Sequence, residues 1–384
     1  MTSSGEKALL PVGMVDLLPP QAEQEADSVA IAIHTLSSHG YERVKPPMLE
    51  FEETLFEGAG AALTQQTFRL MDPSSQRMMG LRADMTPQVV RLAATRLKSQ
   101  ARPLRLCYAG QVLRVRGNQL RSDRQVGQVG AEIIGSDSAE ADAEIIALAA
   151  EALEQIGIHE LTIDLALPTL VPLLIEEAGL SAEEVTTLRE ALDRKDAAAV
   201  ARLPGDAGKL FSGLLKASGP RKTALKKLAA LDLSEEAAAT IERLKAVLER
   251  LDWIKPGLTI TLDPVESRGF EYQTGLSFTF FAGGVRGELG RGGRYLAGSP
   301  EGASEPATGV TLYLDSILRA VEPKAAAPRV YIPLGADPAA AAGLRLEGYV
   351  TVAALEETDD PRGEAERLGC VQWLGPDGPE AVED

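Results

Sequence analysis

Helical spacing of apolar residues recurs in the first part of the chain. Residues 22–38 carry apolar side chains at helical intervals, and Gly40 follows as a helix stop. Residues 139–155 repeat Ala, Glu, Ile and Leu in a pattern that predicts a second helix. Residues 41–49 have an extended pattern that two prolines interrupt. Helices and strands therefore alternate here.

Extended patterns predict a sheet. Two dense apolar runs, 104–115 and 126–134, lie at hairpin distance and are joined by a polar segment rich in arginine. They predict a long antiparallel pair of strands. Shorter extended patterns occur at 160–166, 258–262 and 276–281. A helix at 312–321 closes this region, so the fold class is α+β, with an antiparallel sheet flanked by helices.

Composition divides the rest of the chain. Residues 168–252 are rich in Ala, Leu, Glu and Lys and predict a small helical insertion, in which Ser181 with Glu184 forms a capping box and Ser234 caps a later helix. Residues 322–328 read as a Pro/Ala linker. We expect a core of 1–167 and 253–322, the insertion, a small α/β unit at 329–384, and a frayed acidic end at 380–384.

Charge and composition exclude several classes of function. The 384 residues carry a formal net charge of −17, which argues against nucleic acid as a ligand. Cys107 and Cys370 lie in apolar contexts and are expected to be buried thiols. The three histidines have no metal-site spacing, so we expect neither metal nor cofactor. No stretch is long and apolar enough to span a membrane, so we expect a cytoplasmic protein.

Asp84 and Thr86 form the first candidate for chemistry. On an extended strand they would share a face, and a carboxylate beside a hydroxyl suits an ammonium group. The alternative is a helix N-terminus, because Pro87 fits the first position of a helix over the following residues. The residues alone leave both readings open.

Polar residues next appear in and after an arginine-rich connection. Arg114 and Arg116 belong to a group whose guanidinium forks suit carboxylates or phosphates, although a solvated loop explains them equally well. Gln128 and Glu132 then fall on one side of a strand whose other side is apolar. A Gln and a Glu on a sheet face need a polar ligand or polar partners.

Two glycine-containing clusters, 268–275 and 288–295, complete the candidates. Their glycines allow backbone to approach a ligand closely, but neither cluster has the spacing of a phosphate-binding loop. An ordinary glycine turn is the alternative for each of them.

Taken in order, these clusters resemble the catalytic domain of histidyl-tRNA synthetases, which are class II synthetases. The resemblance covers residues 10–321 and rests on 11–19, 114–132, 268–272 and 292–295. It implies a histidine-binding set of Asp84, Thr86, Arg114, Gln128, Glu132, Arg268, Tyr272 and Tyr295. In that set Asp84 and Thr86 hold the ammonium, Glu132 faces the imidazole and Arg268 approaches the carboxylate.

Departures from the family pattern gather at the ATP end. Ser316 stands where class II synthetases have an arginine that holds the ATP phosphates, Tyr313 replaces a small glycine, and Arg116 replaces an acidic residue. Losing one preorganised cation can cost on the order of 10²–10³ in rate. These three residues imply a degenerate ATP site. At the amino-acid end, Gln273 replaces a tyrosine of the imidazole wall.

A synthetase-like chain with these losses resembles the regulatory subunits of ATP phosphoribosyltransferase, the first enzyme of histidine biosynthesis. The resemblance implies a non-catalytic chain, a short-form catalytic subunit as partner, L-histidine as feedback effector, and a homodimer within a hetero-oligomer. The C-terminal unit is acidic and too short for the usual anticodon-binding domain, which argues against tRNA. The alternatives are an active histidyl-tRNA synthetase and a stand-alone amino-acid sensor.

Overall fold

The computed structural model describes residues 10–56, 58–117, 123–266, 272–298, 304–322 and 326–382. The chain divides into two compact units, Met1–Glu322 and Pro323–Asp384, and each is described by itself. The first unit contains every sequence cluster named above as a candidate for chemistry.

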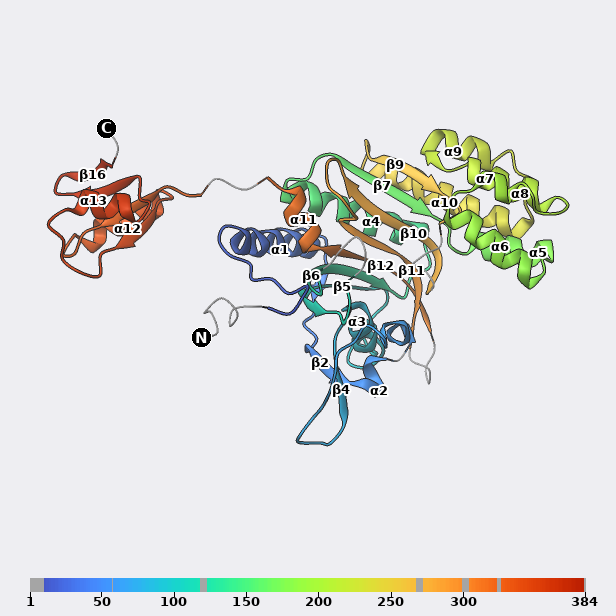
Figure 1. The fold of residues 1–384 in the computed structure, drawn as a ribbon, viewed down its shortest axis with the longest axis horizontal. Coiled ribbons are helices and arrows are strands. Elements are labelled where there is room, and N and C mark those ends of the chain that lie inside the picture. Colours follow the sequence, from blue (N-terminus) through green and yellow to red (C-terminus); the bar gives the residue numbers. More distant parts are fainter. Residues whose placement is uncertain are drawn as a thin grey trace, which may run out of the picture. The chain divides into compact units, whose positions relative to one another are not determined.

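A nine-stranded sheet forms the centre of the described part of the first unit (Figure 1). Its strands follow the order β1-β5-β6-β12-β11-β10-β7-β9-β8. Neighbours pair antiparallel except β1 with β5 and β7 with β9. The strands are β1 (Glu42–Arg43), β5 (Leu104–Leu113), β6 (Gln125–Ile134), β7 (Leu161–Ala166), β8 (Gly219–Pro220), β9 (Thr259–Asp263), β10 (Gln273–Ala282), β11 (Gly290–Ala297) and β12 (Glu305–Tyr313).

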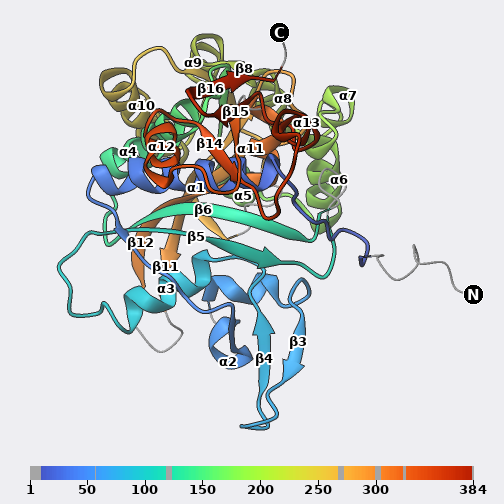
Figure 2. The ribbon, with the colours of Figure 1, turned by 90° about the vertical axis from the view of Figure 1, so that its left-hand side faces the viewer.

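Helices cover both faces of this sheet. Helices α1 (Gln21–Ser38) and α4 (Ala139–Ile156) pack on one face, and α3 (Thr86–Ala94) lies on the other, as Figure 2 shows. α11 (Leu314–Ala320) follows β12 directly and contacts α1. The large apolar core lies between the sheet and α1 and α4. The face toward α3 holds a smaller core and most of the polar candidates.

A small three-stranded sheet, ordered β2-β4-β3, stands beside α3. Its strands are β2 (Leu49–Phe51), β3 (Arg69–Met71) and β4 (Met78–Leu81). Helix α2 (Glu52–Leu55) and the 3₁₀ helix η2 (Gly58–Leu63) connect β2 to β3 and contact α3.

Helices dominate the segment between β7 and β9. They are α5 (Leu170–Ala178), α6 (Ala182–Asp193), α7 (Ala197–Val200), α8 (Ala207–Lys216), α9 (Arg221–Leu228) and α10 (Glu235–Ile254). The predicted caps are confirmed, because Ser181 and Glu184 form a capping box and the Ser234 side chain accepts from Ala237 N. Helix α10 packs along α4 and ties this segment to the sheet.

The second unit is a four-stranded sheet, ordered β14-β13-β15-β16, with two helices. Its elements are β13 (Arg329–Ile332), α12 (Pro338–Leu346), β14 (Val350–Ala353), α13 (Pro361–Arg367), β15 (Gln372–Gly375) and β16 (Gly378–Ala381). The expectation of a frayed end from residue 380 is wrong for the described residues. Glu380 and Ala381 pair with β15, and Val382 is buried, because an apolar side chain anchors the last strand.

Two strands contradict expectations from composition. The glycine cluster at 288–295 forms the central strand β11 and not a turn. A Cβ on Gly292 would lie 2.1 Å from Gly309 O of β12, so glycine is required by the close approach of neighbouring strands. β12 extends to Tyr313, so the helix predicted at 312–321 begins two residues later.

The extended pattern at 41–49 is interrupted as its prolines suggest. Only Glu42–Arg43 and Leu49–Phe51 pair within it, and they belong to two different sheets. Proline cannot donate a ladder hydrogen bond, so a continuous central strand is excluded there.

The part of the chain that the structure describes contains no disulfide bond, no metal-binding cluster and no helix suited to span a membrane. Cys107 and Cys370 are buried and free, as predicted. Those residues contain no group of His, Cys, Asp and Glu arranged to hold a metal ion. None of their helices has the length and apolar character needed to cross a membrane.

Candidate functional site

The polar candidates gather on the sheet face that carries α3. Along β6, Val129, Ala131 and Ile133 point into the large apolar core. Gln128 and Glu132 point to the opposite face because successive side chains of a strand alternate. Strands β5, β10, β11 and β12 belong to the same sheet and supply further side chains of the site, and others come from the start of α3 and from loops.

Asp84 is the centre of the first polar cluster. Its Oδ1 accepts from Thr86 N at 2.9 Å, and its Oδ2 accepts from Gln128 Nε2 at 2.8 Å. The Gln128 Oε1 atom in turn accepts from Met85 N at 3.2 Å. These bonds fix the carboxylate at the start of α3, beside a cavity that it lines.

The local structure at Asp84 and Thr86 decides between the two readings of the sequence in favour of the helix N-terminus. β4 ends at Leu81, and α3 begins at Thr86 with Pro87 in its first turn, so an extended segment is wrong there. The helix N-terminus nevertheless brings both side chains to one cavity. The structural reading and the binding reading are therefore compatible.

Glu132 is the buried carboxylate of the site and is 1% exposed. Its Oε1 accepts from Thr86 Oγ1 and from the Tyr108 hydroxyl, each at 3.0 Å. Its Oε2 accepts from the Tyr295 hydroxyl at 2.8 Å. Gly309 of β12 makes room for this carboxylate, since a Cβ there would lie 1.6 Å from Oε2.

Burial governs the electrostatics of Glu132. Desolvation raises the pKa of its carboxyl group to about 7, although hydrogen bonds from three hydroxyls act in the opposite direction. Burial first, and then the Glu132 charge, raise the pKa of Tyr108 and of Tyr295 well above the usual value. Both phenols therefore stay protonated and act as donors to the carboxylate.

Two adjoining cavities open over these groups. The larger, of about 320 Å³, is lined by Leu63, Gln66, Asp84, Thr86, Pro87, Arg114, Arg116, Gly117, Tyr272, Arg291, Thr311 and Tyr313. The smaller, of about 20 Å³, is lined by Thr86, Glu132, Tyr272, Gln273, Arg291, Gly292, Gly293, Tyr295, Gly309, Val310 and Thr311. Four residues are common to both, so the cavities adjoin.

Most of the histidine-binding set predicted from sequence lies together. Asp84, Thr86, Arg114 and Tyr272 line the larger cavity, and Thr86, Glu132, Tyr272 and Tyr295 line the smaller one. Gln128 does not line either cavity, but it donates a hydrogen bond to Asp84, which lines the larger one. Arg268 lies outside the described residues.

The structure does not bring together all three residues of the predicted degenerate ATP site. Arg116 and Tyr313 line the larger cavity. Ser316 lines neither cavity: it is buried in α11, where its Oγ accepts from Arg319 Nη2 at 3.1 Å. Arg319 also pairs with Asp315 at 3.2 Å.

The sequence argument did not single out several contributors, although Arg291 belongs to the candidate cluster 288–295. Arg291 lines both cavities, and Thr311 hydrogen-bonds the Tyr108 hydroxyl at 3.1 Å. Tyr108 lies opposite Gly130, where a Cβ would come within 2.3 Å of its ring. Gly130 lies between Gln128 and Glu132 on the same face of β6. This glycine was the available signal in the sequence that a large side chain from a neighbouring strand lies over that face.

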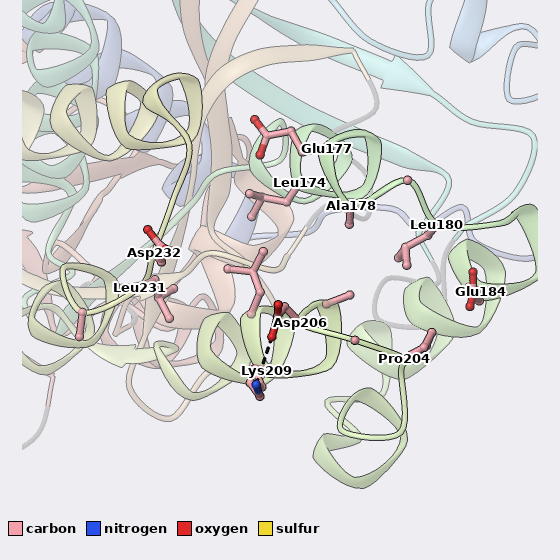
Figure 3. Close-up of a pocket in the computed structure, with 15 residues that line it drawn as sticks. Leu174, Glu177, Ala178, Leu180, Glu184, Pro204, Asp206, Lys209, Leu231 and Asp232 are labelled. Carbon is pink, nitrogen blue, oxygen red and sulfur yellow. Dashed lines mark hydrogen bonds and ion pairs between the residues drawn. The ribbon is translucent and has the colours of Figure 1, made fainter.

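A separate cavity of about 800 Å³ lies among the helices between β7 and β9 (Figure 3). Its apolar lining includes Leu174, Leu180, Leu210 and Leu231. Its carboxylates are at the surface, and Asp206 pairs with Lys209 at 3.1 Å. None of the polar side chains that line it is buried, whereas the site on the sheet includes the buried Gln128, Glu132 and Thr311.

Comparison with known proteins identifies the family of the chain. The family model described as histidyl-tRNA synthetase matches residues 13–317. A protein of Paramagnetospirillum magneticum named ATP phosphoribosyltransferase regulatory subunit is 54% identical over 383 residues, covering 100% of each chain. The chain belongs to the family of ATP phosphoribosyltransferase regulatory subunits. A member of that family from Rhodospirillum centenum is also 54% identical, over 97% of this chain and 96% of its own.

Solved structures confirm the class II synthetase-like α+β fold. A Bacillus halodurans protein described as an ATP phosphoribosyltransferase regulatory subunit/histidyl-tRNA synthetase matches with a TM-score of 0.79 and 25% identity, covering 94% of this chain and 96% of its own. Histidyl-tRNA synthetase from Nostoc has the same TM-score at 18% identity, over 96% of this chain and 92% of its own. The expected regulatory role is likewise confirmed by family membership.

Proposed function

We propose that the chain binds L-histidine on the α3 face of its sheet and thereby regulates a short-form ATP phosphoribosyltransferase catalytic subunit. Two features beside adjoining cavities support this proposal most directly. One is the buried Glu132 carboxylate, and the other is the fixed cluster of Asp84, Thr86 and Gln128. Histidine has two groups that donate hydrogen bonds. Its ring N–H needs an acceptor at the inner end of the site, and its ammonium group needs a second acceptor nearer the surface.

The ligand's three polar groups have matching partners. Asp84, held by Thr86 N and Gln128, accepts from the ammonium. Glu132 accepts from an imidazole N–H at the inner end. The carboxylate faces the larger cavity, where Arg114 is oriented by the bond from its Nε to Ala83 O at 3.3 Å. Arg268 serves as a second carboxylate contact by resemblance, and Tyr272 and Tyr295 line the pocket.

Adenylate formation is not expected at this site. Tyr313 projects into the larger cavity, where family resemblance places a small residue, and Arg116 is unlike the acidic residue of synthetases. Ser316 supplies no cation, and Arg319 beside it is paired with Asp315. Binding of histidine without its activation suits an effector site.

The partner and pathway follow from the names of the relatives. Proteins that share 54% of residues over their full length are named regulatory subunits of ATP phosphoribosyltransferase. We therefore place the chain in histidine biosynthesis, as a homodimer within a hetero-oligomer that the short-form catalytic subunit completes. A net charge of −17 disfavours tRNA as a ligand.

Reconstitution tests this function. The short-form catalytic subunit is assayed for phosphoribosyl transfer alone, with this chain, and with this chain plus histidine. We expect the chain to raise turnover and histidine to lower it. The two proteins are mixed at micromolar concentrations. If the turnover of the catalytic subunit does not change when this chain is added, the proposed partnership is wrong.

Matched variants separate binding from assembly. Glu132→Gln is expected to keep activation and lose inhibition by histidine. Glu144→Gln is the control, because Glu144 also accepts from a tyrosine hydroxyl, that of Tyr41 at 2.9 Å, but lies outside both cavities. Inhibition that persists unchanged in Glu132→Gln would contradict the location of the effector site.

A further inference from the structure

The cavity of about 800 Å³ among the helices between β7 and β9 is an open apolar groove (Figure 3). Its lining residues lie in α5, α6 and α8 or in the connections beside α5, α8 and α9. Leucine side chains from these elements form its floor: Leu174, Leu180, Leu210 and Leu231. The rim includes the exposed residues Glu177, Asp206 and Asp232. The space is therefore a surface groove and not an enclosed ligand pocket.

The packing of the helices keeps the floor of the groove apolar and accessible. Leu174 belongs to the large core, whereas Leu180, Leu210 and Leu231 pack against that core and remain half-buried. Gly213 of α8 makes room for Leu231, since a Cβ on this glycine would lie 2.5 Å from a methyl carbon of the leucine. Apolar surface that is gathered in one hollow, unlike single scattered leucines, is typical of a place where another apolar surface docks.

Carboxylates stand along the rim of this apolar floor. Glu177 and Asp232 have no ion-pair partner among the residues that the structure describes, and Asp206 pairs with Lys209 at 3.1 Å. The C-terminus of α5 and the N-terminus of α8 both line the groove, so their opposite dipole charges offset each other. Side chains therefore set the local charge. Together with the net charge of −17, they favour a cationic occupant.

We propose that this groove docks an amphipathic helix of a protein partner, with apolar side chains on one face and lysine or arginine beside them. A helix is favoured because the walls are helices and their connections, against which a further helix packs by interlocking side chains. Addition of a strand is excluded, since none of the described lining residues belongs to a strand. The proposal goes beyond histidine regulation and does not depend on the histidine site.

Two synthetic helical peptides test the proposal with the full chain. Both carry leucines at spacings of three and four residues, and their other positions hold alanine with lysine in one peptide and alanine with glutamate in the other. Calorimetric titration is expected to show one lysine peptide bound per chain, and binding at least about tenfold weaker for the glutamate peptide. Absence of binding by the lysine peptide, or equal binding of the two peptides, would overturn the proposal.

A matched pair of leucine variants locates the bound peptide. Leu210→Gln keeps the size of the side chain and should weaken binding of the lysine peptide at least about tenfold, because an apolar contact is lost. Leu225→Gln is the control, since Leu225 is also half-buried against the core but lies on α9 outside the groove. If Leu210→Gln binds the peptide as tightly as the wild type, the proposed docking site is wrong.

A second matched pair on α5 tests the charge of the rim. Glu177→Gln is expected to weaken binding of the lysine peptide about two- to threefold at low salt, and high salt should remove the difference. Glu176→Gln, one residue away and outside the lining, should have a smaller effect. Because Glu177 is exposed, this pair decides the question even when Leu210→Gln does not fold. Equal effects of the two substitutions would contradict contact with the rim.

The remaining outcomes are distinguishable. Sedimentation of the wild-type chain without peptide tests a second copy as the occupant, and self-association that Leu210→Gln abolishes would overturn the proposal in favour of that copy. Histidine affinity should be the same in Leu210→Gln and the wild type, because Leu210 lines neither cavity of the histidine site. Absence of histidine binding by the wild type would refute the proposed function and leave the docking groove in place.

Discussion

At the residue scale, the site depends on a carboxylate held where ionisation is costly. Glu132 of β6 is buried on one face of the sheet beside β11 and β12, and hydrogen bonds from hydroxyl groups offset only part of the desolvation of its carboxyl group. A buried carboxylate lowers the stability of the protein without ligand, but it can accept a hydrogen bond from a bound ligand. Removal of its charge should therefore separate stability from binding.

Glu132→Gln should change the pH dependence of stability. The folded-state pKa is raised to about 7 from 4.5, so the folded protein binds more protons than the unfolded chain between these values. Stability conferred by the neutral form is present below pH 4.5 and is lost as pH rises toward 7, by about 3 kcal/mol. In urea unfolding, the free energy of unfolding of the variant should increase relative to that of the wild type between pH 5 and pH 8. An identical difference at both pH values would contradict the buried charge.

Gly309→Ala should disable the site by displacing the same carboxylate. The new Cβ would lie 1.6 Å from Glu132 Oε2, so the side chain must move, at a cost of about 1–3 kcal/mol for overpacking. We expect histidine binding to fall at least about tenfold in calorimetry. Gly343→Ala in α12 is the control, since nothing lies within 4 Å of its Cβ. Unchanged affinity in Gly309→Ala would show that Glu132 is not a ligand contact.

At the element scale, a buried ion cluster joins the site strand to the helices behind it. Asp142 of α4 is 1% exposed. It pairs with Arg294 of β11 at 2.9 Å and with Arg243 of α10 at 3.1 Å. Arg294 also donates to the backbone oxygens of Ser136 and Ser138. The strand that carries Tyr295 is thereby fixed from the face opposite the cavity.

Arg294→Met should be strongly destabilising. It leaves Asp142 buried with one of its two cations removed, and breaking a buried pair costs about 3–5 kcal/mol. Arg221→Met breaks the more exposed pair with Asp252 and should cost less than about 1 kcal/mol. Urea unfolding of both variants gives the comparison. A loss in Arg294→Met no larger than in Arg221→Met would contradict the structural role of the cluster.

Sequence patterns predicted elements where one physical signal dominated. The β5–β6 pair, α1, α4 and the caps at Ser181 and Ser234 followed from apolar spacing and polar caps. β11 did not, because glycines that permit close strand packing resemble a turn when only the sequence is read, and the last residues of β12 were assigned to the helix that follows it. The need for these glycines is visible only from neighbouring strands.

The site shows the same limit. Glu132 and Gln128 were predictable as polar residues on one strand face, and the family resemblance supplied their partners. Tyr108 and Arg291 come from other strands, and their place depends on strand order and register. The place of Gln273 in the lining of the smaller cavity likewise depends on what surrounds it in three dimensions.

At the scale of the whole molecule, the candidate site belongs to one unit. The residues that line the two cavities run from Leu63 to Tyr313, within Met1–Glu322. The second unit has its own sheet and its own small cores. Ligand binding should therefore not require it.

A chain ending at Glu322 should fold and bind histidine. We expect its affinity to stay within about twofold of the full chain, a difference well below 1 kcal/mol. Circular dichroism checks that the shortened chain is folded, and calorimetry measures the affinity. A folded but non-binding product would show that the second unit contributes to the site.

Calorimetric titration of L-histidine into the full chain tests the central claim most directly, because that claim is a retained amino-acid site in a regulatory protein. The account predicts saturable binding of one histidine per chain, lost in Glu132→Gln and kept in Glu144→Gln. Absence of histidine binding by the folded wild-type protein, or equal binding by wild type and Glu132→Gln, would contradict it.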